Sequence, residues 1–392
     1  MAFLASAVRL SVLATFTLIA AAGAGCNASS DADEPDDAEP IDSALSGPSL
    51  SLPDETDDES SLAAASDDAS ATDLIDVRGV GDSAFSKTHE KDPMPAQLGA
   101  ALDRFDASGK LIKGDLTFMN WESVVGDHCD QFSKPYVAGS SYAFLSRAEN
   151  LAQAYARGVN LVGLSNNHSR DCSNGGGEQT SSRMSVPALE SMADNAWLFA
   201  GMSLREEDKS KAKVRTFTIK GKPVRVAFAS VYTGRASCPL ATCQGDTEAV
   251  LKSLRDAPAD LRIIALHSQD SQPALLKTGT DFIEKYNGDI VFGHGPHVWK
   301  PVHIVKKANG KKGAFFESLG NFLHPGCAGQ TRNFIGRALF DSTFQLKQVQ
   351  LTPVENSGIN VKLSAVNGTE VPANLTWRST GRGRAVFANI KR

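Results

Sequence analysis

A short stretch at residues 288–297, with the sequence GDIVFGHGPH, carries two histidines directly after a predicted strand. Residues 289–292 form an apolar run suited to a buried strand, and the glycines and proline that follow turn the chain sharply. His294 and His297 therefore leave the carboxyl end of this strand, the edge where α/β proteins bind ligands. Neutral imidazole is a common metal ligand near pH 7. The stretch predicts a metal site, with a pair of exposed histidines in a turn as the alternative.

Polar side chains that can also bind a metal ion lie at the ends of four other predicted strands. These strands are expected at residues 74–80, 115–120, 159–164 and 261–266, each rich in apolar or β-branched residues. The polar residues at or just after their ends are Asp82, Asn120, Glu122, Asn166, Asn167, His168 and His267. Oxygen and imidazole ligands together suit manganese, iron or zinc more than calcium. Taken singly, each strand end also fits ordinary turn chemistry.

The first 26 residues have the pattern of an export signal. Arg9 precedes an apolar run at residues 10–22, and small residues then lead into Cys26. This run is shorter than the stretch of about 20 apolar residues that a membrane-spanning helix needs. A cysteine directly after small residues resembles a bacterial lipobox, although Gly23 stands where such boxes usually carry leucine. We expect export with a lipid attached at Cys26, and plain secretion is the alternative.

Residues 27–72 contain no lysine, arginine or aromatic residue, and we expect them to form a disordered acidic stalk. Residues 1–72 hold 14 of the 45 acidic side chains but one of the 40 basic ones. Residues 73–392 therefore carry 39 bases against 31 acids, a net charge of +8. A basic body favours anionic partners such as phosphates or an anionic polymer. No motif typical of nucleic-acid binding accompanies this charge.

The folded part has room for one large α/β domain or two smaller ones. Helices are expected at 95–105, 143–156, 186–195 and 247–256, and hairpins at 214–231 and 302–318. Beyond residue 325, alternating polarity predicts a β-rich C-terminal extension at 326–392.

Five further cysteines lie in this part of the chain, and an exported protein can keep them as disulfides. Cys238 and Cys243 could close a small loop. Cys129 and Cys172 each follow a candidate site strand, so a bridge between them could brace the site. Cys327 would be left over, and the sequence alone does not fix the connectivity.

The order of these motifs resembles the CapA capsule-synthesis family, the poly-γ-glutamate biosynthesis type. Its domain looks like a relative of calcineurin-like metallophosphoesterases. The resemblance covers roughly residues 74–325. The motifs that carry it are GD at 81–82, DLTFMNWES at 115–123, LSNNH at 164–168, LH at 266–267, GHGPH at 293–297 and SLGNF at 318–322.

The resemblance implies a metallophosphoesterase-like α/β fold at residues 73–325, a four-layer α/β/β/α sandwich with two divalent metal ions at the strand ends. His168 would face the substrate as the catalytic acid, and Glu122 or Asp82 would bridge the metals. Asn120, Asn166 and Asn321 would contact substrate or support the ligands. The implied metal ligands are Asp82, Glu122, Asn167, His267, His294 and His297.

Two positions depart from the family pattern. Gly295 stands where the family usually carries the second of two adjacent histidines, and Ser271 stands where it tends to carry a glutamate. These departures concern substrate handling more than metal binding, because every implied ligand type is present.

Two functions are compatible with the sequence. In the first, the protein is a metal-dependent phosphoesterase or other hydrolase in capsule synthesis, acting on a phosphate ester or an anionic polymer. In the second, it is a non-catalytic envelope lipoprotein that binds or exports an anionic capsule polymer. Both place the protein outside the cytoplasm, anchored through lipid, beside a membrane capsule-synthesis complex and without a nucleic-acid partner.

Overall fold

The structure, a computed structural model, describes residues 73–86, 97–134, 142–192, 196–268, 272–325, 330–357, 360–363 and 375–378. The expected export signal, the acidic stalk, Cys26, Ser271 and Cys327 lie outside these described residues. Within them, no helix combines the length and the apolar character that crossing a membrane requires.

The larger of two main sheets is built around the strand that carries Asp82. Its order is β16-β15-β14-β1-β2-β5-β6, with β13 also paired to β1 and β17 to β15. β1, β2, β5 and β6 run parallel, whereas β14 is antiparallel to β1. The strands are β1 (Ile75–Ser83), β2 (Leu116–Trp121), β5 (Leu161–Gly163), β6 (Leu198–Ala200), β13 (Asn321–Leu323), β14 (Gln330–Phe340), β15 (Leu346–Ser357), β16 (Asn360–Leu363) and β17 (Leu375–Arg378).

The smaller sheet carries the two strands that end in His267 and His294. Its order is β11-β12-β10-β9-β8-β7, with β8, β9, β10 and β12 parallel. The expected hairpins are present as the antiparallel pairs β7–β8 and β11–β12. The strands are β7 (Lys213–Ile219), β8 (Lys222–Tyr232), β9 (Leu261–His267), β10 (Ile290–His294), β11 (Trp299–Lys306) and β12 (Lys312–Leu319).

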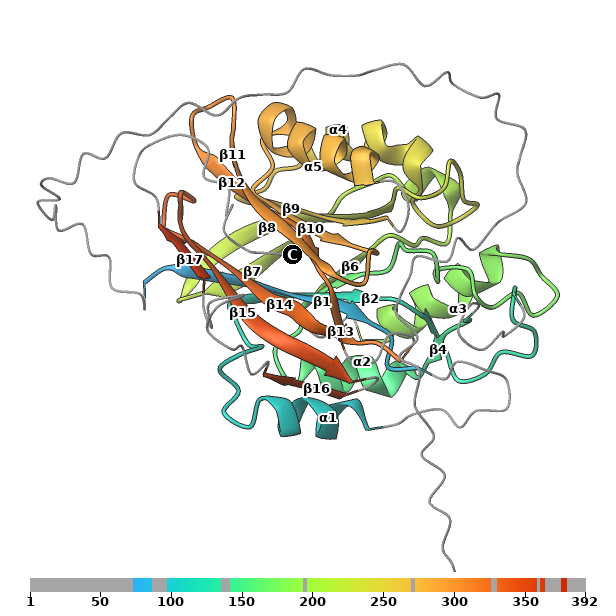
Figure 1. Cartoon of the computed structure of the whole chain (residues 1–392). Coiled ribbons are helices and arrows are strands. Elements are labelled where there is room, and N and C mark those ends of the chain that lie inside the picture. The colour runs from blue at the N-terminus through green and yellow to red at the C-terminus, as the bar shows by residue number, and fades with distance from the viewer. Residues whose placement is uncertain are drawn as a thin grey trace, which may run out of the picture.

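The two sheets pack face to face over an apolar core (Figure 1). Phe118 of β2 stacks on Phe292 of β10 with ring centroids 4.8 Å apart, and Phe292 stacks in turn on Phe316 of β12 at 5.4 Å. Burying such rings is strongly favourable, because each removes a large apolar area from water. The core therefore fixes one sheet against the other.

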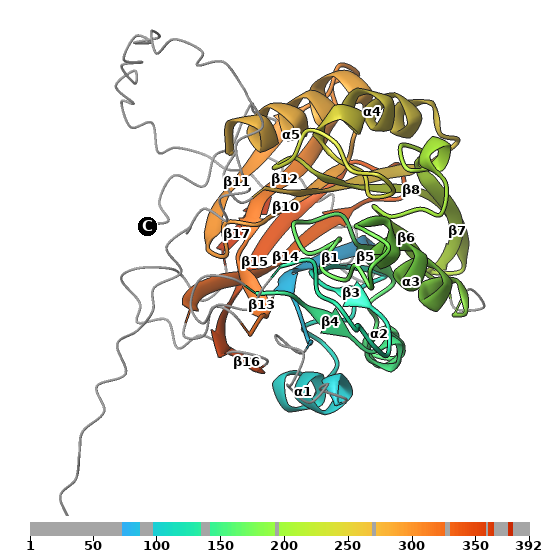
Figure 2. The same ribbon diagram turned by 90° about the vertical axis from the view of Figure 1, so that its right-hand side faces the viewer.

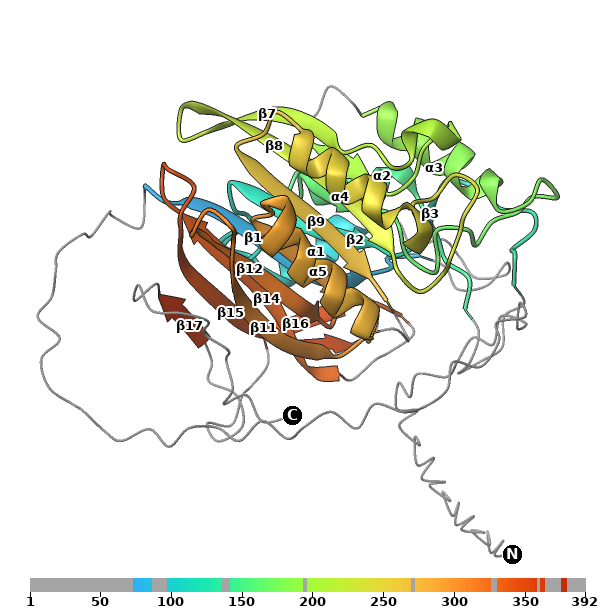
Figure 3. The same ribbon diagram turned by 90° about the horizontal axis from the view of Figure 1, so that it is seen from above.

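Helices lie on the outer side of each sheet (Figures 2 and 3). Leu98, Leu151 and Leu189 of three helices pack with Met119 and Val162 of the larger sheet. These helices are α1 (Leu98–Phe105), α2 (Ala148–Tyr155) and α3 (Gln179–Glu190), and the two over the smaller sheet are α4 (Thr247–Asp256) and α5 (Gln272–Tyr286). The predicted α/β class is confirmed.

Three of the four expected helices begin at other positions, and the first of them, α1, begins at Leu98 instead of residue 95. Leu145–Ser146 forms β4, which pairs with β3 (Val124–Val125), so α2 begins at Ala148 instead of residue 143. α3 begins seven residues earlier than expected, because its first half buries serines instead of apolar residues.

The segment after residue 325 joins the larger sheet. β14 pairs with β1 from Ile75↔Phe340 to Gly79↔Gly336, and β15 pairs with β14 along most of its length. The described strands β14 to β17 thus extend the sheet that holds Asp82. The domain boundary at residue 325 stays a prediction.

Candidate metal centre

Pairing between strands brings the candidate side chains to one edge. In the larger sheet Asp82 is level with both Asn120 and Asn321. In the smaller sheet His294 is level with His267. A contact between the sheets joins the two pairs, since Nδ2 of Asn120 lies 3.3 Å from Nδ1 of His267.

Asp82 is fully buried and held in place from two sides. Nδ2 of Asn120 donates a hydrogen bond to its Oδ1 (2.8 Å), and the backbone N–H of Gly295 donates to its Oδ2 (3.2 Å). Burial alone would raise the pKa of Asp82, but the bond to His297 and the nearby imidazoles hold it well below its usual range. The distances from Asp82 oxygens to the imidazole Nδ1 atoms are 3.8 Å for His267, 3.7 Å for His294 and 3.3 Å for His297.

Glu122 differs from Asp82 in its hydrogen bonds and in the direction of its pKa shift. It is fully buried, and neither carboxylate oxygen has a hydrogen-bond partner among the described residues. Burial, and next the charge of Asp82, raise the pKa of Glu122 well above its usual value. The imidazole Nε2 atoms around it lie 3.7 Å (His267), 3.9 Å (His168) and 4.0 Å (His297) from Oε1, and 3.6 Å (His324) from Oε2.

His267 and His294 are poised as neutral ligands. Burial lowers their pKa values to about 3 and about 4, so both imidazoles are uncharged at neutral pH. Neither nitrogen of His294, nor Nε2 of His267, has a hydrogen-bond partner in the described part of the chain. A buried nitrogen with a lone pair and no donor to accept from is suited to a metal ion.

His297 and His324 lie side by side, with ring centroids 4.6 Å apart. His297 has a left-handed backbone (φ 56°), and its Nδ1 lies 2.9 Å from Oδ1 of Asn321. Burial works against charge on His297, but Glu122 and Asp82 raise its pKa to about 9. Burial, and next the charge on His297, lower the pKa of His324 well below its usual value. His324 was not among the candidates, although it stands two residues after the SLGNF motif.

The donors form two groups that could each hold a cation. Asp82, Glu122 and His267 make one, and Glu122, His297 and His324 make the other, with the ligand atoms of each group within 4.8 Å of one another. Glu122 belongs to both groups, so its carboxylate would help to hold a cation in either one. The mixed oxygen and nitrogen set, with its unsatisfied buried atoms, fits divalent metal.

His168 points its Nε2 at the same carboxylate and is held from behind. Its Nδ1 lies 2.5 Å from Oδ2 of Asp171, which also accepts the backbone N–H of Phe144 (2.6 Å). Burial lowers the pKa of His168 and raises that of Asp171 to about 7. Asp171 was missed from the sequence, although it stands three residues after His168.

The asparagines of the LSNNH stretch have different surroundings. Asn166 supports the loop, since its Nδ2 donates to the Trp121 carbonyl (3.0 Å) and its Oδ1 accepts the His168 N–H (3.0 Å). Asn167 is buried, and neither atom of its amide has a hydrogen-bond partner among the described residues. Of all the sequence-predicted site residues, Cys26 alone lies outside the described chain.

The backbone conformation explains why position 295 is a glycine. Its φ of 106° is a conformation that residues with a side chain rarely adopt, and a Cβ there would lie 2.3 Å from the Ser268 carbonyl oxygen. A second histidine at this position would clash with the backbone after β9.

Two sheets whose strand ends gather carboxylate, amide and imidazole side chains define an α/β protein with a candidate metal centre. Comparison with known proteins is more specific: the model of the family described as "Bacterial capsule synthesis protein PGA_cap" matches residues 80–325. The chain therefore belongs to this family of capsule-synthesis proteins, which confirms the resemblance seen in its motifs.

Among solved structures, the chain is similar to a hypothetical protein from Thermus thermophilus, with 12% identity and a TM-score of 0.37. The match covers 78% of this chain and 99% of that one. No curated protein matches the chain.

Proposed function

We propose that this capsule-synthesis protein is a metal-dependent hydrolase, which binds two divalent cations at Glu122 and cleaves a phosphate ester or related bond in anionic capsule material. In this proposal the paired sheets with their outer helices form a four-layer sandwich of the metallophosphoesterase type. One observation carries it: buried polar atoms without hydrogen-bond partners converge at one sheet edge. They are both oxygens of Glu122, the amide of Asn167, Nε2 of His267 and both nitrogens of His294 and His324.

Energetics argue for a cation among these atoms. Each buried polar group without a partner costs about 1–3 kcal/mol, and a charged one costs more. A cluster of this size would consume a large part of the net stability of a domain, which is about 5–15 kcal/mol. A bound divalent ion satisfies the carboxylate and imidazole atoms together, and this supports the metal centre.

The chain's own residues have defined roles in this hydrolysis. When bound, divalent cations would lower the pKa of a water molecule and offset negative charge on the substrate. His168 would give a proton from Nε2 to the leaving oxygen, while Asp171 holds the ring through Nδ1. An arriving anionic substrate raises the pKa of His168 and so favours the protonated imidazole that this step needs.

The proposal places the protein in the cell envelope. The apolar run and Cys26 support export with a lipid anchor, and the acidic segment 27–72 would hold the domain away from the membrane. A membrane capsule-synthesis complex is the expected setting, and its anionic product is the expected partner.

A phosphoesterase assay with Mn²⁺, run with metal analysis of each protein, tests the proposal. We expect His294→Ala to lose both bound metal and activity. His168→Ala should keep the metal and lose about 10²–10⁴-fold in rate, the usual contribution of a general acid. His128→Ala is the matched control, because His128 is an exposed histidine that pairs with Asp130. Equal activity in all three variants would contradict the proposal.

A further inference from the structure

Phe144 is fully buried and packs against two histidines of the candidate metal centre. The centroid of its ring lies 4.1 Å from that of His168, the proposed general acid, and 5.3 Å from that of His324. Both imidazoles also approach one carboxylate. Nε2 of His168 lies 3.9 Å from Oε1 of Glu122, and Nε2 of His324 lies 3.6 Å from its Oε2. One phenyl ring therefore contacts two of the imidazoles that surround Glu122.

Packing orients the ring of His324. Neither Nδ1 nor Nε2 of this histidine has a hydrogen-bond partner among the described residues. A histidine that binds a metal usually donates its second ring N–H to a carboxylate or a carbonyl, and that bond fixes the ring. His324 instead has two ring contacts: an edge-to-face contact with Phe144, at an interplanar angle of 89°, and the contact with His297. Its orientation therefore depends on these neighbouring rings.

His168 is held by a hydrogen bond and by the same phenyl ring. Its Nδ1 lies 2.5 Å from Oδ2 of Asp171, and the backbone N–H of Phe144 donates to this oxygen as well (2.6 Å). A bond at Nδ1 fixes that nitrogen but allows the rest of the ring to tilt about it. The phenyl ring packs on the imidazole with an interplanar angle of 39°, and close packing of this kind limits the tilt.

The backbone of Phe144 is itself fixed. The Val124 N–H donates to the Phe144 carbonyl (3.2 Å), next to the pairing of β3 with β4 and two residues after Glu122. The disulfide Cys129–Cys172 lies in the small apolar core that also contains Val124. The phenyl ring therefore meets both imidazoles from a backbone with little freedom to move.

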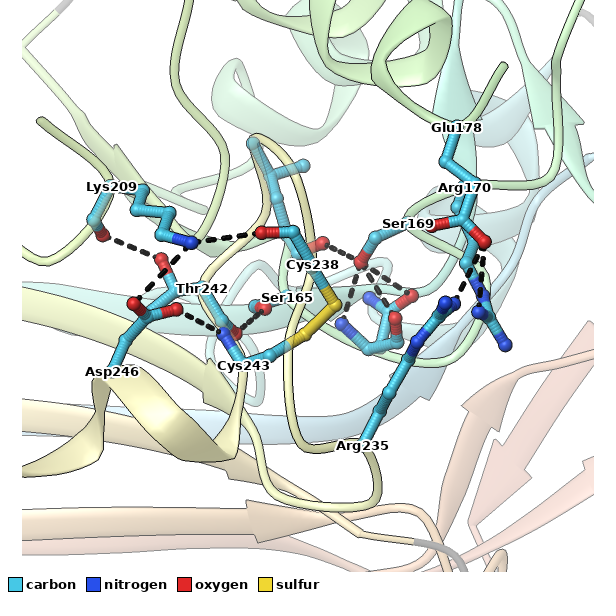
Figure 4. Close-up of a disulfide and its surroundings, with 12 residues drawn as sticks. Ser165, Ser169, Arg170, Glu178, Lys209, Arg235, Cys238, Thr242, Cys243 and Asp246 are labelled. Carbon is cyan, nitrogen blue, oxygen red and sulfur yellow. Dashed lines mark hydrogen bonds and ion pairs between the residues drawn. A yellow bond between two sulfur atoms is a disulfide. The ribbon is translucent and has the colours of Figure 1, made fainter. Parts of the chain in front are cut away.

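A second loop fixes the backbone of the LSNNH stretch (Figure 4). Ser165 Oγ donates to the Thr242 carbonyl, and the disulfide Cys238–Cys243 closes the loop that contains Thr242. In the same loop the Gln244 N–H donates to the Arg235 carbonyl (2.9 Å). The backbone of the stretch is thus anchored, and the side chain of its histidine is the part that remains to be positioned.

We propose that Phe144 is a positioning residue, whose ring keeps the general acid and one metal ligand in place together. Without the ring, Nε2 of His168 could move away from the leaving oxygen, and His324 could turn away from its cation. In the hydrolysis the electrons of the broken P–O bond go to the leaving oxygen, which takes the proton from Nε2 of His168. The inference rests on the proposed function, because it assigns a residue that supports the acid and a ligand of the same site.

Phe144→Leu removes the ring but keeps an apolar side chain and the backbone N–H that donates to Asp171. Titration of the metal-free protein with Mn²⁺, followed by electron paramagnetic resonance, measures cation affinity without turnover. We expect the affinity for one of two cations to fall about 10–100-fold, the usual effect of losing a group that orients a metal ligand. Thermal unfolding checks that the variant is folded, and Phe144→Met is measured in its place if it is not.

Rates at saturating Mn²⁺ test the position of His168. The substrates are 4-nitrophenyl phosphate, whose leaving oxygen departs readily without a proton, and phenyl phosphate, whose leaving oxygen depends more on a general acid. We expect Phe144→Leu to lower kcat for phenyl phosphate by up to about 10²-fold, the cost of a small misplacement of a catalytic group. The loss for 4-nitrophenyl phosphate should be much smaller, and KM should stay unchanged for both esters. A merely structural role would lower both rates equally.

Phe315→Leu is the matched control, because Phe315 is also fully buried and also contacts a histidine ring, that of His303 at 5.4 Å. His303 belongs to neither donor group. The control should keep the cation affinities and both rates of the wild type. Wild-type cation affinities together with an unchanged ratio of the two rates in Phe144→Leu would overturn the inference, and so would equal effects in Phe144→Leu and the control.

The titration and the rates separate this inference from the proposed function. A wild type that binds two cations but hydrolyses neither ester would contradict the hydrolase, and the weakened cation in Phe144→Leu would still support the positioning role. An active wild type whose cations and rate ratio are unchanged in Phe144→Leu would contradict the positioning role alone. A wild type that binds no cation would overturn both.

Discussion

Glu122 differs from Asp82 although both are fully buried carboxylates at the same edge. Asp82 accepts hydrogen bonds from Asn120 and Gly295, whereas Glu122 accepts none from the described residues. The pKa shifts follow: that of Asp82 is lowered and that of Glu122 is raised, the latter chiefly by burial. A bound cation would therefore favour the charged form of Glu122.

Glu122→Gln should abolish the stabilisation by metal, whereas His324→Ala should remove part of it. In the proposed function each donor group holds one cation. Glu122 belongs to both groups and His324 to one, so the first variant should lose both cations and the second should lose one. The measurement is thermal unfolding with EDTA or Mn²⁺, together with metal content. In the wild type, a cation at about a hundredfold its Kd stabilises the fold by about 3 kcal/mol per site.

His303→Ala provides the control for His324→Ala. His303 bonds to Glu317 (3.0 Å) on the β11–β12 hairpin and belongs to neither donor group. If His303→Ala and His324→Ala lost metal equally, His324 would have no special place in the centre.

At the scale of elements, the sequence predicted well the strands that end at candidate metal ligands. Apolar runs stop abruptly at Asp82, Glu122, His267 and His294, and parallel pairing then has to bring these ends together. His324 was not predictable in this way, because β13 has three residues and offers no periodicity. Asp171 lies in a loop, where nothing in the residue spacing marks a side chain that turns back to His168.

The sequence pattern also failed to predict where α3 begins. Its inner face begins with serines that bond to the site loops: Ser181 Oγ donates to the Cys172 carbonyl (2.8 Å), and Ser185 Oγ accepts the Val125 N–H (2.9 Å). Apolar spacing recurs only from Val186. Periodicity finds helices that pack on a core and misses helices that pack on polar loops.

Asp76 links β1 to β14 and should make stability sensitive to acid. It accepts hydrogen bonds from Arg78 and from Arg337, the latter at 2.9 Å and 2.8 Å. Burial alone would raise the pKa of Asp76, but these arginines lower it below the usual 3.8. A carboxylate with a lowered pKa stabilises the fold above about pH 4, and this stabilisation is lost as the pH falls through the folded value.

Asp76→Asn should therefore lower the free energy of unfolding by about 1–3 kcal/mol at neutral pH, with a smaller loss in strong acid. Denaturant titrations at several pH values measure this. The control is Asp103→Asn, which breaks an exposed pair with Arg157 and should cost much less, because solvent screens an exposed ion pair. Equal costs for the two variants at every pH would contradict the argument.

At the scale of the whole molecule, the two disulfides should contribute unequally to stability. Cys129–Cys172 spans 43 residues and Cys238–Cys243 spans five. A cross-link limits the unfolded chain more when its loop is longer, so the first should contribute about 4 kcal/mol and the second about 2 kcal/mol. Denaturation of the two double cysteine-to-serine variants measures the difference.

Reduction of the wild type with dithiothreitol serves as the reference for these variants. It should lower stability by about as much as both double substitutions combined, provided that they act independently. A larger cost for the five-residue loop would show that native contacts of Arg235 and Gln244, and not chain entropy, dominate.

The aromatic stack between the sheets has a consequence for cation affinity. Phe118 lies in this stack, and its ring also contacts the ring of His294 at 5.1 Å, while Asn120, two residues further along β2, spans from Asp82 to His267. The distances between the ligands therefore depend on how tightly the inner faces of the two sheets pack. Replacing Phe118 with a smaller residue would let the ligands of one sheet shift relative to those of the other. The protein would then bind metal more weakly although it was still folded.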